Sequence, residues 1–218
     1  MPYYRPLITC PDDENEFSYI KGSDKGPEHW GELHKEWAAC GNGKLQSPID
    51  LSNKIVKITS ELGMLKTCYK PFDATLKNEG HVIMLQWNGD AGFLEINGTK
   101  YFLKQIHWHH PSEHVINGLR FDLEAHLVHA SANNEKAVLA VMYKLGAPDS
   151  LLSELEGQIR HLSADNKTEA NVGAIDPSHV KIGGWKYYRY SGSLTTPPCT
   201  EGVIWTINEQ VYIYEHIV

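Results

Sequence analysis

The pattern of apolar and polar positions predicts β-strands along most of the chain. Between residues 76 and 103, short apolar runs are separated by Asn-Gly turns, which is typical of antiparallel hairpins. Residues 137–143 form a continuous apolar run and predict a strand that is buried on both faces. One helix is predicted from Asp149 or Ser150 through Leu162, because leucine and isoleucine recur there at helical spacing. The pattern therefore indicates a mostly β chain with at least one amphipathic helix.

The most distinctive stretch is residues 105–130, which hold six histidines. His107 and His109 lie two residues apart, so on a strand their side chains project from the same face. After the Asn117-Gly118 turn, alternating apolar and polar residues predict a second strand that carries His126. If the two strands pair, these three imidazoles converge on one point. The sequence leaves the register open, because the turn can contain a bulge.

Three neutral imidazoles are a ligand set suited to zinc. Such a set leaves the fourth tetrahedral position for water, which is typical of a catalytic zinc site. Gln105 precedes His107 by two residues, and Glu124 precedes His126 by two, so each shares a strand face with its histidine. Both side chains can accept the outer ring N–H and fix the tautomer. The alternative is a solvated polar sheet face, and the spacing alone does not decide between the two.

Composition and charge exclude several classes of protein. The formal net charge of −7 argues against a general nucleic-acid binder, and we see no apolar run long enough to cross a bilayer. The length of 218 residues suits one domain with one substantial core. Residues 1–16 lack the apolar content of a signal peptide and are expected to be a flexible N-terminal segment. Asn97 and Asn166 begin sequons for N-glycosylation, a signal that is common by chance.

Five motifs in order give the chain a resemblance to a known family. They are the Gln105-to-His129 hairpin, Gly26-Pro-Glu-His-Trp30, Gln46-Ser-Pro-Ile-Asp50, Asn78-Glu-Gly-His81 and Ser191-Gly-Ser-Leu-Thr-Thr-Pro-Pro198 with Glu201 and Trp205. With these motifs, residues 17–218 resemble the alpha-class carbonic anhydrases. The residues within several of the motifs resemble those of the plant members of the family. That plant group includes both enzymes and carbonic-anhydrase-like storage proteins. The resemblance implies a mostly β (α+β) single domain with a large, twisted, mostly antiparallel central sheet and a few peripheral helices.

The resemblance also implies a reaction and roles for individual residues. His107, His109 and His126 would hold Zn2+, and a zinc-bound hydroxide would attack carbon dioxide to give bicarbonate and a proton. His81 would carry that proton to buffer. Glu113 would orient Thr195, and Thr195 would orient the hydroxide. The substrate pocket would be lined by Val128, Val138, Leu194, Thr196 and Trp205, and Tyr19 would lie near the site.

Further implications concern covalent structure and location. The resemblance places a disulfide between Cys40 and Cys199, whereas Cys10 and Cys68 have no obvious partner. It suggests the secretory pathway, with an extracellular or plastid location. Expected ligands are carbon dioxide, bicarbonate, sulfonamides and inhibitory anions. Nucleic-acid binding and a membrane span are not expected, and the chain would be a monomer or a homodimer.

The chain also departs from the family pattern. His110 stands where a tryptophan or serine is expected, and we do not predict it as a ligand. The family's C-terminal segment, with its Asn-x-Arg-Pro motif and final strand, is not recognisable after Trp205, so sheet edges are expected to be exposed. The alternatives to an enzyme are a non-catalytic storage or binding protein and an inactive truncated product. An unrelated zinc hydrolase would need a general-base carboxylate near the metal.

Overall fold

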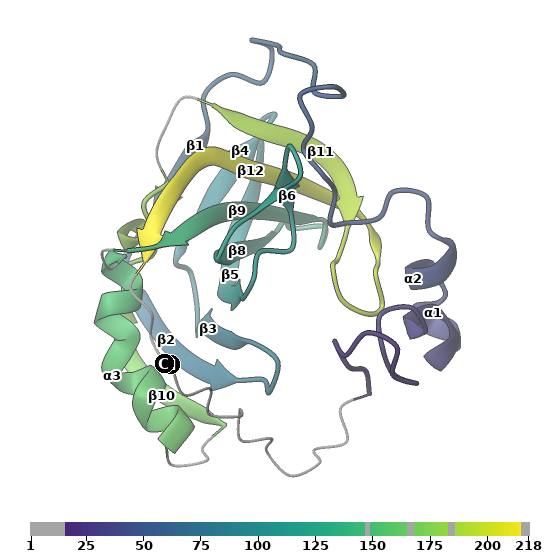
Figure 1. Cartoon of the computed structure of the whole chain (residues 1–218). Coiled ribbons are helices and arrows are strands. Elements are labelled where there is room, and N and C mark those ends of the chain that lie inside the picture. The colour runs from purple at the N-terminus through teal and green to yellow at the C-terminus, as the bar shows by residue number, and fades with distance from the viewer. Residues whose placement is uncertain (1–15, 147–148, 165–167, 183–185, 215–218) are drawn as a thin grey trace.

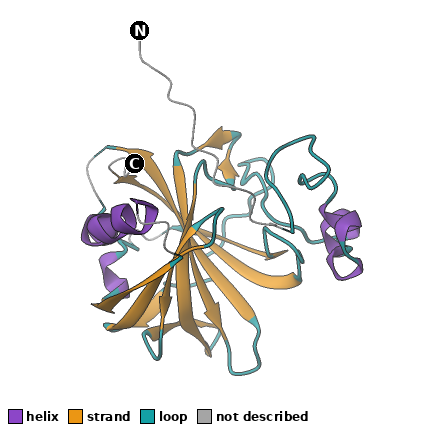
Figure 2. Cartoon of the chain, turned by 90° about the horizontal axis from the view of Figure 1, so that it is seen from below, coloured by secondary structure: helices purple, strands orange, loops and turns teal. Residues whose placement is uncertain are grey.

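The computed structural model describes residues 16–146, 149–164, 168–182 and 186–214, and its dominant feature is one twisted sheet of ten strands (Figure 1). In chain order these strands are β1 (Lys66–Tyr69), β2 (Phe72–Asn78), β3 (Ile83–Trp87), β4 (Gly92–Ile96), β5 (Thr99–His109), β8 (Leu123–Ala130), β9 (Lys136–Leu145), β10 (Glu169–Ile175), β11 (Tyr187–Ser193) and β12 (Glu201–Tyr214). Helices lie at the periphery of the sheet (Figure 2). The predicted fold class is confirmed.

The strands follow one path across the sheet in the order β10-β2-β3-β5-β8-β9-β12-β11. Strand β4 lies off this path, where it pairs with β5 and with β1. Among the described strands, β12 and β9 pair in parallel and every other pair is antiparallel. Strands β5 and β8 therefore lie in the interior of the sheet, with a hydrogen-bonded neighbour on each side.

Two Asn-Gly turns place both of their residues in the left-handed region, as tight hairpins require. Asn97 and Gly98 have φ of 50° and 81° and join β4 to β5. Asn117 and Gly118 have φ of 52° and 76°, but they join the short strands β6 (Val115–Ile116) and β7 (Leu119–Arg120). That hairpin forms a separate two-stranded sheet, and it lies between β5 and β8 in the sequence. The histidine strands therefore pair across an inserted hairpin and not across a simple turn.

Strand β9 is buried on both faces, as its continuous apolar sequence predicts. One face of β9 contributes Leu139, Val141 and Tyr143 to the larger apolar cluster, against which helix α3 (Ser150–Ala164) also packs. Val138 and Met142 face a second cluster that includes residues of β12. Because the two clusters lie on opposite faces of the sheet, β9 contributes to both.

Helix α3 (Ser150–Ala164) begins at the predicted cap. Asp149 Oδ1 accepts the backbone N–H groups of Leu151 and Leu152 at 3.0 and 3.3 Å, which makes Asp149 the capping residue. The apolar face of α3 packs against β2 and β10. The remaining helical elements are short: α1 (Trp30–Leu33), η1 (Lys35–Trp37), α2 (Ala39–Asn42) and η2 (Pro177–His179). None of the described helices is long and apolar enough to cross a membrane.

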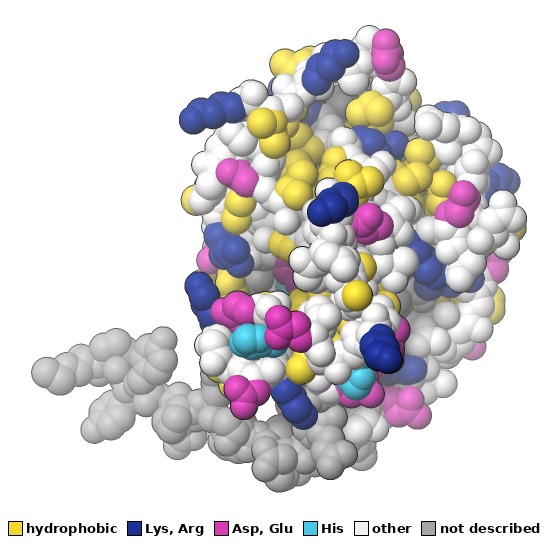
Figure 3. Space-filling view, turned by 90° about the vertical axis from the view of Figure 1, so that its right-hand side faces the viewer, with side chains coloured by type: hydrophobic (Ala, Val, Ile, Leu, Met, Phe, Trp, Pro, Cys, Tyr) yellow, Lys and Arg dark blue, Asp and Glu magenta, His cyan; other side chains and the backbone are white. Residues whose placement is uncertain are grey.

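Strand β11 is the last strand of the sheet path, and a groove of about 750 Å³ lies beside it. Residues 49–64 form the opposite wall, where Ile55, Ile58 and Met64 are exposed. Figure 3 shows hydrophobic side chains gathered in the upper part of this side of the molecule. Strand β11 therefore forms one end of the sheet path, with the groove beside it.

Candidate metal centre

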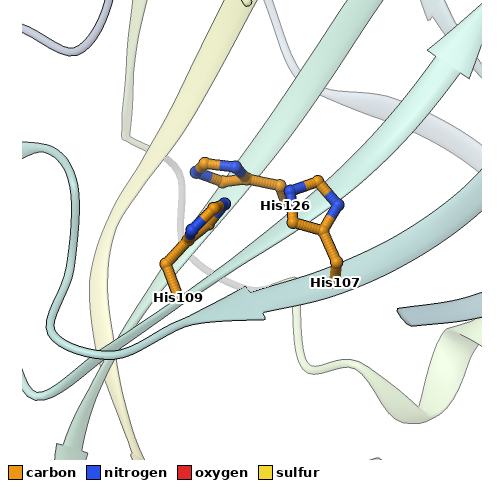
Figure 4. A group of neighbouring side chains, drawn as sticks. All are labelled: His107, His109 and His126. Atoms are coloured by element: carbon orange, nitrogen blue, oxygen red, sulfur yellow. The ribbon is translucent and has the colours of Figure 1, made fainter. Parts of the chain in front are cut away.

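The register of β5 and β8 brings the three predicted ligands together. His107 lies directly opposite His126, and His109 shares the face of His107 because two residues separate them. The three side chains offer nitrogen atoms that all lie within 4.8 Å of one another. Figure 4 shows the rings pointing toward a common point. The predicted convergence is confirmed, and the register that the sequence left open is settled by the strand pairing.

Two outer acceptors orient the rings. Gln105 Oε1 lies 2.8 Å from His107 Nδ1, and Glu124 Oε1 lies 2.7 Å from His126 Nε2. These bonds leave Nε2 of His107 and Nδ1 of His126 for a metal. His109 Nε2 is buried and has no hydrogen-bond partner among the described residues. A buried nitrogen without a partner is costly unless a ligand satisfies it, so the three residues fit a tetrahedral zinc ion.

Burial keeps the imidazoles of His107 and His109 neutral. It lowers the pKa of His107 well below its usual value, and the neighbouring His126 and His109 rings lower it further. Burial likewise lowers the pKa of His109 to about 3, with a contribution from His126. The neutral ring is the form that donates a lone pair to a metal. The environment therefore favours the ligating form throughout the physiological pH range.

Glu113 and Thr195 lie beside this cluster. Glu113 Oε2 is 3.5 Å from His109 Nε2 and 3.9 Å from His126 Nδ1. Burial and the nearby Glu124 raise the pKa of Glu113 to about 8, and hydrogen bonding to the Thr195 side chain opposes that rise. Glu113 and Thr195, which the resemblance implies as an interacting pair, are therefore adjacent in space although they lie 82 positions apart in the sequence.

A cavity of about 240 Å³ opens onto the three histidines. Its lining includes all the residues predicted for the substrate pocket: Val128, Val138, Leu194, Thr196 and Trp205. Thr195 and His81 also line it. Sequence reasoning missed Val82 and Met84, which complete the wall. Met84 lies in the cavity because the pairing of β3 with β5 places it opposite His107. The local sequence around Met84 does not indicate this pairing.

His81, the predicted proton shuttle, lies at the edge of the cavity, where it is exposed. Its ring centroid lies 5.3 Å from that of Phe17 and 5.9 Å from that of Tyr19. Burial of part of the ring lowers the pKa of His81. The predicted proximity of Tyr19 to the site agrees with this contact.

The other histidines of the 105–130 stretch lie outside the ligand set. His110 is exposed, and its Nδ1 donates to the backbone carbonyl of Asp122 at 2.6 Å. His129 is buried between the Tyr69 hydroxyl, 2.8 Å from Nε2, and the Ala137 carbonyl, 3.2 Å from Nδ1. The position of His110 matches the expectation that it is not a ligand.

Cys40 and Cys199 form the disulfide that the resemblance implies, with sulfur atoms 2.06 Å apart. The bond ties helix α2 to the loop that follows Thr196. Cys68 is free and exposed, whereas Cys10 lies outside the described residues. Asn97 is exposed on its turn, and Asn166 also lies outside the described residues. Glycosylation of either asparagine stays a prediction.

Comparison with known proteins agrees with this site. Alpha carbonic anhydrase 7 of Arabidopsis thaliana is 53% identical over 200 residues, which cover 92% of this chain and 73% of that protein. A crystal structure of dioscorin complexed with ascorbate matches with a TM-score of 0.90 and 47% identity, covering 92% of this chain and 84% of that chain. The alpha-carbonic anhydrase of Thermovibrio ammonificans, solved with sulfanilamide, matches with a TM-score of 0.82 and 36% identity, covering 92% and 86%.

The sequence model of the eukaryotic-type carbonic anhydrases matches residues 25–217, which include all the residues of the histidine cluster and its cavity. The fold, the disulfide and the convergent histidines agree with that match. The chain belongs to the eukaryotic-type carbonic anhydrase family.

Proposed function

We propose that this chain catalyses the zinc-dependent, reversible hydration of carbon dioxide to bicarbonate and a proton. The observation that carries the proposal is the set of three convergent imidazoles, two of them fixed by outer acceptors, at the base of a partly apolar cavity. His107 Nε2, His109 Nε2 and His126 Nδ1 would hold the zinc ion. A zinc ion bound there would lower the pKa of a coordinated water to about 7 and so supply hydroxide at neutral pH.

The cavity provides the remaining elements of the reaction. Val128, Val138 and Leu194 form an apolar wall that suits carbon dioxide, which has no charge to solvate. Thr195 would accept a hydrogen bond from a water-derived nucleophile in the cavity and donate its own hydrogen to Glu113, and this pair would orient the nucleophile toward the substrate. This role requires Glu113 to be a carboxylate. A cation bound within a few ångströms would lower the pKa of Glu113 and favour that form.

His81 suits the transfer of the product proton to buffer. It lies on the same cavity as the ligands while its ring remains exposed to solvent. An imidazole near neutral pH can accept a proton on one side and release it on the other. Hydrolysis of activated esters by the same nucleophile is an expected side reaction.

Zinc content and carbon dioxide hydration of the purified, cooperatively folded chain test the proposal. We expect one zinc per chain and hydration that sulfanilamide inhibits. His109→Ala should abolish both zinc binding and hydration while the fold is retained. His110→Ala is the matched control, because His110 is exposed and outside the cluster. Zinc binding without hydration would contradict the proposed reaction, and absence of zinc would contradict the site itself.

A second candidate is a non-catalytic storage or binding role. The observation that favours it is the similarity to the dioscorin solved with ascorbate, whose TM-score of 0.90 exceeds that of the sulfanilamide-bound relative. Titration calorimetry with ascorbate on the zinc-loaded chain would test this role. Saturable ascorbate binding together with zinc but without hydration would favour it over catalysis.

We also propose a location in the secretory pathway, outside the cell or in the plastid. The Cys40–Cys199 disulfide supports an oxidising compartment, since reducing compartments keep cysteines as thiols. Fractionation of cells that express the tagged protein would test it, and recovery in the cytosol with reduced cysteines would contradict it.

A further inference from the structure

A continuous line of hydrogen bonds, buried at His126 and partly buried at β11, leads across the molecule. Glu124 Oε1 lies 2.7 Å from both His126 Nε2 and His114 Nδ1. His114 Nε2 lies 2.7 Å from the Tyr190 hydroxyl, which in turn lies 2.6 Å from Ser47 Oγ. His114, Glu124 and His126 are at most 1% exposed, so no bulk water competes for these bonds.

The direction of each bond follows from the chemistry at Glu124. Its second carboxylate oxygen accepts the backbone N–H groups of Glu113 and His114, each at 2.8 Å. These two backbone donors favour the charged form of the Glu124 carboxyl group. Because the group is a carboxylate, both imidazoles must donate to Oε1.

The remaining protons are then fixed one after another. In the tautomer of His114 that donates through Nδ1, Nε2 carries only a lone pair, so the Tyr190 hydroxyl would donate to it. The Tyr190 oxygen can then accept from Ser47 Oγ. Ser47 Oγ in turn accepts the backbone N–H of Ser193 at 3.1 Å. The donors from the Ser193 loop through His114 therefore all point toward Glu124, and His126 donates to the same carboxylate from the other side.

The far end of this line is fixed to the loop that holds Thr195. Ser193 Oγ donates to the backbone carbonyl of Leu194 at 2.7 Å, and Trp205 Nε1 donates to the carbonyl of Ser193 at 2.9 Å. The Trp205 ring packs 4.8 Å from the His126 ring, measured between centroids. The same set of contacts therefore holds the loop and the metal ligand.

We infer that Tyr190 is a positioning residue for the metal ligand His126, acting through His114 and Glu124. The inference rests on the zinc site proposed above. Tyr190 does not line the metal cavity, so it has no direct contact with the proposed substrate position. Its hydroxyl selects the His114 tautomer that donates to Glu124. Glu124 can then keep the proton of His126 on Nε2 and the lone pair of Nδ1 toward the metal.

Histidine tautomers in the zinc-free, full-length chain test the inference without reference to activity. Nitrogen-15 NMR at neutral pH is expected to show His114 protonated on Nδ1 alone and His126 on Nε2 alone. In Tyr190→Phe, His114 is expected to lose this single state. A His114 that is protonated on Nε2, or on both nitrogens, in the unmodified chain would overturn the inference.

Zinc affinity, measured by competition with a chelator, supplies the second readout. Tyr190→Phe is expected to weaken zinc binding about tenfold, the scale typical of lost outer-ligand contacts. Tyr188→Phe is the matched control, because Tyr188 lies on the same face of β11 and no hydrogen bond from its hydroxyl to a described residue is present. Unchanged affinity in Tyr190→Phe, or equal losses in both variants, would overturn the inference.

Ser47→Ala keeps the inference testable if Tyr190→Phe does not fold. It removes the donor to the Tyr190 oxygen but leaves the Tyr190–His114 bond, so a smaller loss of zinc affinity is expected. A loss of zinc affinity greater than about tenfold in Ser47→Ala would contradict the assigned direction. If the unmodified chain binds no zinc, the proposed function fails, while the tautomer measurement still decides the hydrogen-bond direction.

Discussion

Removal of the Cys40–Cys199 disulfide is expected to have a large and calculable effect on stability. The bond joins residues separated by 159 positions, so it restricts most of the unfolded chain. Loop-closure entropy for a loop of this length corresponds to about 5 kcal/mol at 25 °C. Natural domains have total unfolding free energies of about 5–15 kcal/mol, so the double variant Cys40→Ala/Cys199→Ala should lose a large share of its stability.

Urea unfolding followed by tryptophan fluorescence would measure this loss. With a slope of about 3 kcal/mol per molar urea, a loss of about 5 kcal/mol lowers the midpoint by about 2 M. Cys68→Ala is the control, because Cys68 is free and exposed and should leave the midpoint unchanged. A midpoint for the double variant within about 0.3 M of the unmodified chain would refute the reasoning.

Four further predictions concern single residues. Burial lowers the pKa of His129 to about 4, against about 6.5 in the unfolded chain. The free energy of unfolding that this shift contributes is present above pH 6.5, and it should fall by about 2 kcal/mol between pH 7 and pH 5. His129→Gln should lack this component when the free energy of unfolding is measured against pH. His81→Ala should slow hydration about 100-fold in dilute buffer, with full zinc content and recovery on adding imidazole; loss without recovery would contradict the shuttle role. Gly92→Ala should destabilise the chain by more than about 2 kcal/mol in urea unfolding, because its φ is +102° and a Cβ would lie 2.0 Å from the Cys68 carbonyl oxygen. Gly157→Ala, in α3 with open space around it, should instead stabilise by about 1 kcal/mol.

Local chemistry accounts for much of the fold that the sequence predicts. Strand β9 is a continuous apolar run, and the turn at Asn97-Gly98 needs residues that tolerate positive φ, so both are readable from neighbouring residues. The cap at Asp149 is also local, because its side chain bonds the first N–H groups of its own helix.

Features of the site that depend on distant residues were not readable in this way. The opposition of His107 and His126 depends on the inserted β6–β7 hairpin, whose length no period-2 pattern fixes. The contact of Ser47 with Tyr190 joins residues 143 positions apart. The adjacency of Glu113 and Thr195 is predicted only by the family resemblance. Sequence patterns specify elements, whereas the pairing of elements specifies the site.

The order of strands across the sheet has a consequence for synthesis of the protein. Strands β5 and β8, at the centre of the sheet, leave the ribosome before β10, β11 and β12, which lie toward its two edges. The three imidazoles can therefore gather on the nascent chain while the segment with Thr195 has not yet been made. On this order, the ability to capture a metal would precede the ability to use it, because β12, which pairs in parallel with β9, is made later.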